Sequence, residues 1–320
     1  MKRSTKFWLI AAAALLLIGG LIFAGGMSIL KWDFTKLSFN EYQTNAYTVG
    51  EEYGGISIVT DTADVELMIS NGSETSVVCY EQITGRHSVS VKDGVLVIEL
   101  ENTKKWYEYI GIDFGTPKIT LTLPAGGYGD LGIKLSTGNV NIPSGLGFEN
   151  IDITASTGAV TNRACASGDI KIKTSTGRVV LEDISAASLD LSTSTGKVKL
   201  DGIDCRKDIN IKVSTGKTEI SDAECRNLIS NGSTGSVTLT NVIATEGFSL
   251  ERSTGNVKFE GCDAAELHIE TDTGDVKGSL LSEKVFITET DTGRIDVPKT
   301  TAGGICEIGT DTGDIKITIE

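Results

Sequence analysis

The sequence predicts an all-β protein, a single-stranded parallel β-solenoid (β-helix) of about ten 19–20-residue rungs with an N-terminal β cap, preceded by one transmembrane helix. Three observations predict this class. A Ser-Thr-Gly or Asp-Thr-Gly tripeptide recurs every 19 or 20 residues between 126 and 320. Apolar residues keep fixed places around each tripeptide. The chain of 320 residues has 37 glycines and only 4 prolines, which suits many short strands joined by tight turns.

Residues 7–30 form the predicted transmembrane helix, a signal anchor that contacts the lipid bilayer. These positions carry no charge and are numerous enough to cross a bilayer with some tilt. Three basic residues in segment 1–6 predict a cytoplasmic N-terminus, so this single-pass protein of the cell membrane is expected to hold its C-terminal domain outside the cell. A cleaved signal peptide is the alternative, although its apolar region normally spans about 7–15 residues. Residues 31–50 are expected to be a juxtamembrane linker.

Residues 51–125 lack the repeat but contain strand patterns, and they are expected to form the β-rich cap. A cap is needed because an open first rung would expose an edge strand to pairing with other chains. The stretch 104–117, "KKWYEYIGIDFGTP", is expected to pack in the core of the cap, with an aromatic patch for a partner or glycan as the alternative. The expected strands are 55–59, 64–70, 75–80, 87–91, 95–100 and 118–124.

Residues 126–320 form the predicted solenoid, with a glycine at one corner of every rung. Two short strands of alternating polarity flank each corner, and each strand is expected to pair in parallel with its copy in the next rung. Glycine suits the corner because it can adopt a positive φ without a steric cost. The corner glycines are Gly138, Gly158, Gly177, Gly196, Gly216, Gly235, Gly255, Gly274, Gly293 and Gly313.

The last three corners read Asp-Thr-Gly, the tripeptide that carries the catalytic aspartate of pepsin-like proteases. Those enzymes need two aspartates from separate lobes that share a proton, and an apolar residue precedes each one. Here threonine precedes Asp272, Asp291 and Asp311. The tripeptide is therefore interpreted as a variant of the Ser-Thr-Gly corner, and no catalytic residue is predicted. The three stacked aspartates are weak candidates for a Ca²⁺ site.

The residues that follow these three glycines are Asp275, Arg294 and Asp314. In chain order they alternate in charge, as expected for a stabilising ladder. A second pattern is Thr-x-Thr before the corner, found in five rungs such as Thr174/Thr176. If these threonines were stacked and exposed, they would form a flat hydroxyl array of the kind that binds ice.

Five of the six cysteines follow the repeat. Cys165 and Cys262 fall in an apolar column, Cys205 and Cys225 in a column of small residues, and Cys306 at an apolar strand position. They are interpreted as small buried hydrophobic residues. The alternative is a disulfide between Cys205 and Cys225, because equivalent Cα atoms in neighbouring rungs stand about 4.8 Å apart.

The net charge of −14 argues against nucleic acid as a partner, since a phosphate-binding protein needs a basic face. No paired CxxC or histidine cluster is present, and no cofactor is predicted.

The order of segments resembles a bacterial family. An N-terminal anchor is followed by "ISIVTDTADVELMIS", "LVIEL", "ITLTLP" and serial "STGxVxI" corners. This order is similar to the β-strand-repeat family of unknown function labelled "putative adhesin", which includes LiaG-like envelope proteins. The resemblance implies a β-helix displayed at the cell surface, with a role in adhesion or envelope stress, and it implies no catalytic residues.

The expected function is that of a non-catalytic, membrane-anchored surface module of the bacterial envelope, with an unknown protein, glycan or cell-wall ligand. The first alternative is an envelope-stress accessory that binds a membrane partner. A polysaccharide-active β-helix enzyme would need an acid/base pair or Ca²⁺-bound carboxylates in a groove. Function must be decided from sites, because the fold does not supply it.

Overall fold

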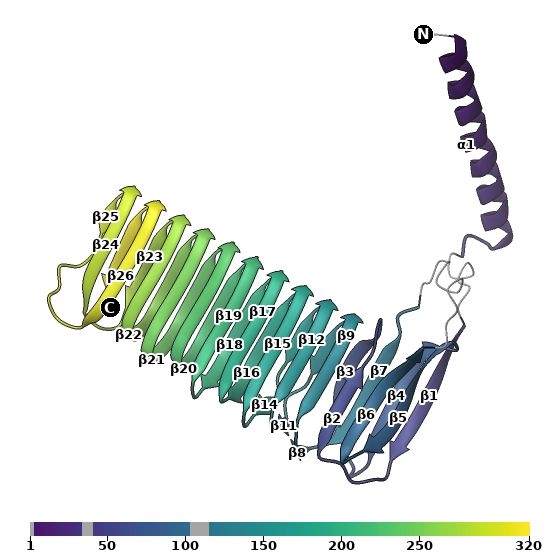
Figure 1. Ribbon diagram of the computed structural model, residues 1–320, viewed down its shortest axis with the longest axis horizontal. Coiled ribbons are helices and arrows are strands. Elements are labelled where there is room, and N and C mark those ends of the chain that lie inside the picture. The colour runs from purple at the N-terminus through teal and green to yellow at the C-terminus, as the bar shows by residue number, and fades with distance from the viewer. Residues whose placement is uncertain (1–2, 34–40, 103–114) are drawn as a thin grey trace.

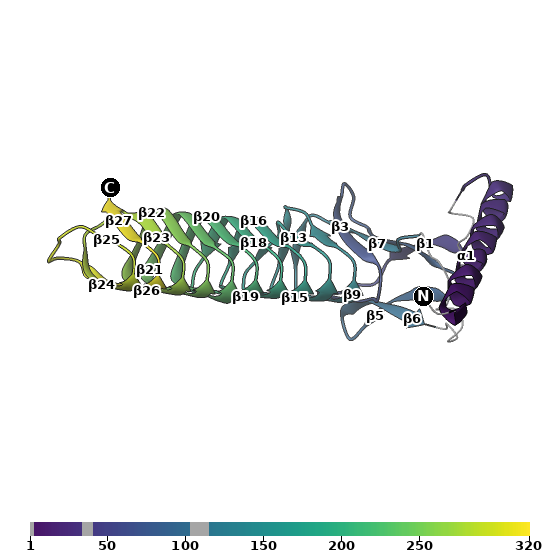
Figure 2. The same ribbon diagram turned by 90° about the horizontal axis from the view of Figure 1, so that it is seen from above.

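The computed structural model describes residues 3–33, 41–102 and 115–320, and it confirms a parallel β-solenoid (Figure 1). Helix α1 (Arg3–Ile29) lies at one end of the rod and residue 320 lies toward the other end. One apolar helix, Thr5–Ile29, is long enough to cross a membrane. Seen from above, the solenoid is a row of parallel coils of similar cross-section (Figure 2).

The cap contains one strand that the sequence did not reveal. β1 lies inside the segment expected to be a linker, and it pairs antiparallel with β4. Most of the aromatic stretch at 104–117 lies outside the described residues. The strands of this region are β1 (Tyr42–Val49), β2 (Gly55–Val59), β3 (Asp64–Ser70), β4 (Thr75–Gln82), β5 (Gly85–Lys92), β6 (Val95–Asn102), β7 (Lys118–Pro124) and β8 (Gly126–Tyr128).

β2 and β3 form a further rung of the solenoid, before the ten that the tripeptide predicts. β2 pairs in parallel with β9, and Ile56 lies beside Leu131; β3 pairs with β10, and Val65 lies beside Val140. The corner between them is Asp-Thr-Ala, so Ala63 stands at the position where each of the ten predicted rungs has glycine. β6 and β7 continue this parallel stack, and β5, β4 and β1 then close it with antiparallel pairs.

The solenoid strands stack residue over residue. Ile151 lies between Leu131 and Ile170, and the same register continues along the rod, so like side chains form continuous columns. One apolar core runs from the cap to β27. The strands are β9 (Leu131–Thr137), β10 (Val140–Ile142), β11 (Leu146–Phe148), β12 (Ile151–Thr157), β13 (Val160–Asn162), β14 (Cys165–Ala166), β15 (Asp169–Thr176), β16 (Val179–Ala186), β17 (Ser188–Thr195), β18 (Val198–Cys205), β19 (Asp208–Thr215), β20 (Thr218–Thr234), β21 (Val237–Thr254), β22 (Val257–Thr273), β23 (Val276–Leu280), β24 (Lys284–Thr292), β25 (Ile295–Asp296), β26 (Gly304–Thr312) and β27 (Ile315–Ile319).

The corner glycines are required by close contact between backbones. Gly216 has a φ of +148°, and a Cβ atom there would stand 1.7 Å from the carbonyl oxygen of Gly196 in the rung before it. The Gly216 amide donates a hydrogen bond of 2.8 Å to the Thr234 carbonyl in the rung after it. A side chain at this corner would therefore separate neighbouring rungs.

The order of the last two rungs differs from the prediction. β26 pairs in parallel with β22 on one side and with β24 on the other, and β27 lies between β23 and β25 in the same way. The chain therefore skips one place, builds the outer rung β24–β25, and returns to fill the gap with β26–β27 (Figure 1). Stacking in strict chain order is wrong for these two rungs.

Two consecutive glycines begin the inserted rung. A Cβ at Gly303, whose φ is +96°, would stand 1.8 Å from the Glu283 carbonyl oxygen. A Cβ at Gly304 would stand 1.7 Å from the Ala265 carbonyl oxygen. The start of β26 thus fits only as bare backbone between its two neighbours. The swapped order of the last two rungs also matches their burial. The inserted rung contains the buried Cys306, Ile308, Ile315 and Ile317, whereas the outermost rung, β24–β25, contains the exposed Ile287 and Ile295.

Four residues that depart from the apolar repeat meet at one place in the core. Arg252 is 3% exposed, and its Nη atoms donate to the Ser230 carbonyl and hydroxyl, both at 2.8 Å, and to Thr218 Oγ1 at 3.2 Å. Gly232 lies directly beside it, where a Cβ would be 3.3 Å from the guanidinium carbon. Burial lowers the pKa of Arg252 to about 10, so the side chain stays charged at neutral pH among neutral acceptors.

Replacing Arg252 by alanine is expected to destabilise the protein by about 2–4 kcal/mol, because it leaves a cavity and unpaired buried hydroxyls. The triple variant Arg252→Thr, Thr218→Val, Ser230→Leu restores the residue types of the repeat and should recover most of this loss. Denaturant unfolding of Arg252→Ala and of the triple variant, each compared with the parent chain, measures these changes in the free energy of unfolding. Equal stability of Arg252→Ala and the parent chain would contradict the expectation.

Candidate functional site

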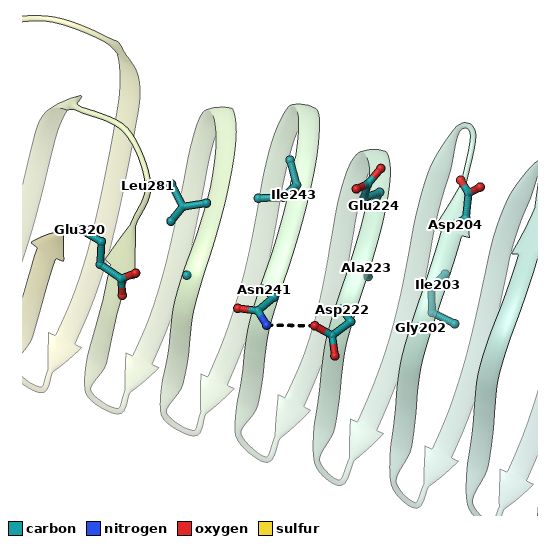
Figure 3. Close-up of a pocket in the computed structure, with 11 residues that line it drawn as sticks. Gly202, Ile203, Asp204, Asp222, Ala223, Glu224, Asn241, Ile243, Leu281 and Glu320 are labelled. Atoms are coloured by element: carbon teal, nitrogen blue, oxygen red, sulfur yellow. Dashed lines mark hydrogen bonds between the residues drawn. The ribbon is translucent and has the colours of Figure 1, made fainter.

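A groove crosses the rungs on the face that carries the second strand of each coil (Figure 3). Its volume is about 680 Å³, and it runs from Gly202 through Asp222 and Asn241 to Leu281 and Glu320. Asp204, Glu224 and Ile243 stand in one column of successive rungs, because Asp204 pairs with Glu224 and Glu224 with Ile243. The groove is thus a product of the repeat rather than of a single loop.

A second corner of the coil shapes the floor of this groove. Six residues after the corner glycine, five successive rungs have a left-handed residue, with φ between 50° and 67°. This conformation is rare outside glycine, asparagine and aspartate, which are the residue types found. This column lies outside the apolar repeat, although its restriction to aspartate, asparagine and glycine is a usable signal in the sequence. Its members are Asp183, Gly202, Asp222, Asn241 and Gly261.

Side chains and bare glycines alternate along part of this corner column. A Cβ at Gly202 would stand 2.5 Å from Asp183 Oδ1, and one at Gly261 would stand 2.9 Å from Asn241 Oδ1. Between them, Asn241 Nδ2 donates to Asp222 Oδ1 at 2.9 Å (Figure 3). The glycines leave room for the polar side chains of the preceding rungs, so the column presents ordered oxygen atoms to the groove.

The groove is acidic and partly apolar. Four carboxylate residues line it, Asp204, Asp222, Glu224 and Glu320, and none of the described residues that line it is a lysine or an arginine. Leu281 adds an apolar side chain that is 48% exposed. An arrangement of fixed negative charges beside apolar groups can bind a ligand that carries positive charge and some apolar surface.

A neighbouring hollow of about 750 Å³ lies beside the inserted rung. Lys284 is 3% exposed there and its ammonium group contacts Asp263 Oδ1 at 2.6 Å. Burial would raise the pKa of Asp263, but the hydrogen bonds from Lys284 and Ser282 prevail and lower it. This pair connects the outer rung to β22 across the inserted strand, so we assign it a structural role.

The three aspartates proposed for Ca²⁺ lie at the ends of β22, β24 and β26, two residues before the corner glycines, and none of them lines the groove. Asp272, Asp311 and Asp291 follow each other in that order, because Asp311 belongs to the inserted rung. All three are exposed. Within the described parts of the chain, they do not bring their oxygens together closely enough to count among groups of three potential metal ligands. The Ca²⁺ site stays a prediction, with no geometric support.

The residues after the corner glycines make backbone contacts instead of alternating charges. The inserted rung places Asp314 between Asp275 and Arg294. Asp275 Oδ1 accepts from the Asp314 amide, and Asp314 Oδ1 accepts from the Arg294 amide, both at 2.9 Å. The expected charge alternation is wrong, and hydrogen bonding between rungs explains why Asp or Asn suits these positions.

The Thr-x-Thr pattern is not an exposed hydroxyl array. The first threonine of each pair faces the core, and Thr174, Thr193 and Thr271 are at most 2% exposed. A flat ice-binding surface of paired threonines is therefore excluded for these rungs.

Four of the five solenoid cysteines are buried as expected, and no disulfide joins Cys205 to Cys225. Burial raises the pKa of Cys225 and Cys306 to about 12, so their thiols stay protonated and unreactive. Cys165 departs from the prediction because it is half-exposed, while Ala164 and Ala166 on either side face the core. The sulfur of Cys165 accepts from the Ser185 amide at 3.3 Å.

Comparison with protein families supports the architecture. The family model described as Toastrack DUF4097 matches residues 53–207 and again 204–320. The chain belongs to the Toastrack DUF4097 family. The two matches overlap at 204–207, so Gly202 and Ile203 of the groove lie in the first match and the later groove residues lie in the second. Comparison with curated proteins finds no match.

Several solved structures are similar to this Toastrack chain. A putative adhesin from Parabacteroides merdae is 13% identical, with 74% of this chain and 96% of that chain covered and a TM-score of 0.50. A putative adhesin from Bacteroides fragilis is 18% identical over 88% and 99%, with a TM-score of 0.42. A putative lipid binding protein from Parabacteroides distasonis is 16% identical over 86% and 97%, with a TM-score of 0.41. At these identities the likeness concerns the fold alone.

Proposed function

We propose that this chain is a membrane-anchored surface protein of the bacterial envelope that binds a positively charged ligand in the groove of its solenoid. The observation that carries the proposal is the acidic groove, whose charges are fixed by the rungs of a rigid rod. The rod would be held by α1, with the cap toward the membrane and the groove farther out. The names of the similar solved structures agree with a role in adhesion.

We infer that the protein acts by binding rather than by catalysis. A general acid at neutral pH needs a carboxyl group with a raised pKa. The hydrogen bond from Lys199 lowers the pKa of Asp201, that from Arg226 lowers the pKa of Asp208, and that from Lys277 lowers the pKa of Asp275. These groups therefore suit stable charged surfaces, not proton transfer.

The groove is tested by reversing two of its charges. The variant Asp204→Lys, Glu224→Lys should bind a fluorescent decalysine peptide about tenfold more weakly than the parent full chain in liposomes, equivalent to about 1.4 kcal/mol. The difference should shrink at high salt, because exposed charges are screened. The control is Asp152→Lys, Asp190→Lys, which makes the same charge change on the exposed face of the first strands.

The control variant shows whether the peptide binds in the groove or is attracted only by the negative net charge of the chain. If both variants lose the same affinity, the peptide binds the net charge of the chain and the groove has no special role. If only the groove variant is weaker, cells that display the full chain should also attach less to neighbouring cells when they carry this variant.

A second candidate function is contact with a membrane partner through the cap. The first rung and the cap expose several large apolar side chains. They include Met68 and Ile69 on β3, Tyr80 on β4 and the nearby Ile83, each 38% to 46% exposed. Such a surface suits an accessory protein of an envelope-stress system. Cross-linking in membranes from position 69, compared with position 204, would show which surface meets a partner.

A further inference from the structure

The cap contains one cluster of metal-ligating side chains that the repeat does not explain. Cys79 and Glu81 are two residues apart on β4 and point to the same face, and His87 follows on β5 after a tight turn. Their exposed fractions are 0%, 1% and 3%. The sulfur, a carboxylate oxygen and a ring nitrogen all lie within 4.8 Å of one another, the only such group of three among the described residues.

Neighbouring groups orient the carboxylate of Glu81 and the imidazole of His87. Glu81 Oε2 accepts from the His87 backbone amide at 2.7 Å and lies 2.6 Å from His87 Nδ1. Asn45 Nδ2 donates to Glu81 Oε1 at 2.6 Å. On the far side of the ring, His87 Nε2 lies 2.9 Å from Thr60 Oγ1. These contacts fix the carboxylate and the imidazole in place.

We propose that Cys79, Glu81 and His87 bind one divalent transition metal ion of the zinc class. Thiolate, imidazole and carboxylate together suit Zn²⁺ or Co²⁺ rather than Ca²⁺ or Mg²⁺, which prefer oxygen ligands alone. A divalent ion with one thiolate, one carboxylate and one neutral imidazole has no net charge. That is the state that a buried site tolerates best.

The observed distances fit such an ion after a small adjustment. At the usual bond lengths, ligand atoms around a tetrahedral zinc ion stand about 3.3–3.7 Å apart. The contact between His87 Nδ1 and Glu81 Oε2 would therefore open by about 1 Å. The three protein ligands leave a fourth position for water.

The surrounding hydrogen bonds match those of known metal sites. A histidine that ligates through one nitrogen usually donates its other N–H to an oxygen, and the ligating carboxylate is itself hydrogen-bonded. Thr60 Oγ1 and the Asn45 amide supply these two contacts. Burial, with a smaller effect of Glu81, raises the pKa of the Cys79 thiol to about 12, so metal binding would release its proton.

A metal here would join four segments of the cap. Cys79 and Glu81 belong to β4, His87 to β5, Asn45 to β1, and Thr60 follows β2, the first strand of the solenoid. The ion would tie the strands that close the stack to the rung that begins it. It would thereby stiffen the part of the chain between the membrane helix and the rod.

The test uses the purified full chain in detergent, reduced and freed of metal by a chelator. Titration with Co²⁺ should produce a near-ultraviolet thiolate-to-cobalt absorption band that saturates at one ion per chain, and Zn²⁺ should displace it. Replacing Cys79 by serine should remove the band. Asn45→Ala, which keeps all three ligands, should weaken Zn²⁺ binding about 10–100-fold.

The matched control is Cys225→Ser, another buried cysteine far along the solenoid, which should leave the band and the affinity unchanged. Absence of a saturable band in the parent chain would overturn the proposal and leave the cluster as a hydrogen-bonded network. A band that persists in Cys79→Ser would also overturn it, because another cysteine would then be the ligand.

Discussion

Replacing Gly216 by alanine is expected to prevent the middle of the solenoid from folding, or to destabilise it by more than about 4 kcal/mol. The alanine would have to adopt a φ of +148°, and its Cβ would stand 1.7 Å from the Gly196 carbonyl oxygen. The clash can be relieved only by moving two rungs apart, which breaks their hydrogen bonds, and the strained φ would remain. Circular dichroism and denaturant unfolding of the full chain in detergent measure the effect.

The control for this substitution is Gly309→Ala. Gly309 lies in a strand of the same stack, and a Cβ there meets no atom within 4 Å. This variant should be as stable as the parent chain or slightly more stable, because alanine restricts the unfolded state. If the two alanine variants were equally stable, the role assigned to the corner glycines would be wrong.

Ending the chain at residue 303 is expected to unfold two rungs rather than one. The deletion removes β26 and β27, and β24 pairs with β26 alone among the described strands. Without that partner, the apolar side chains of the outer rung that pack against the core are only the partly buried Phe286 and Val297. Hydrogen exchange of β24 should become at least about 100-fold faster, equivalent to about 2.8 kcal/mol of local stability.

The control for the truncation is removal of Glu320 alone, which keeps every paired residue of β27. Its β24 amides should stay protected. Protection of β24 that survives the longer deletion would show that β24 can dock directly on β22, and it would contradict the dependence on the inserted rung.

The sequence was sufficient to predict the coil because every rung needs the same residue types at the same positions. Each corner needs a residue without a side chain, and each strand needs inward apolar residues at fixed offsets. The first rung departs from this rule. Its corner residue between β2 and β3 is Ala63, so the tripeptide is absent and the sequence predicts a cap there rather than a rung. β1 was missed because its pattern is interrupted by polar residues that lie on a cap surface, half-buried at most.

The order of the last two rungs could not be read from the periodicity. The intervals from Gly274 to Gly293 and from Gly293 to Gly313 are 19 and 20 residues, the same as elsewhere. A repeat determines the conformation of each rung, but it does not determine which rungs pair with each other. Gly303-Gly304 was the local sign of an unusual fit, and its meaning depends on the backbones of Ala265 and Glu283 on either side.

The candidate groove was also beyond the repeat search, which compared residues with the corner glycine and its adjacent strands. The left-handed column mixes aspartate, asparagine and glycine, so it does not stand out as one residue type. The metal-ligating cluster in the cap was hidden for another reason. Cys79 and Glu81 become neighbours of His87 only through the hairpin, and neither spacing matches a familiar ligand pattern.

The inserted rung has a consequence for how the protein is made. The ribosome makes the N-terminal end of a chain first, so each coil up to β23 can fold onto the preceding coil as it is synthesised. β24–β25 has no strand to pair with until residues 304–319 fill the place between it and β22–β23, so the last two coils form together. Assembly is therefore progressive along most of the rod and ends in a single concerted step at its tip.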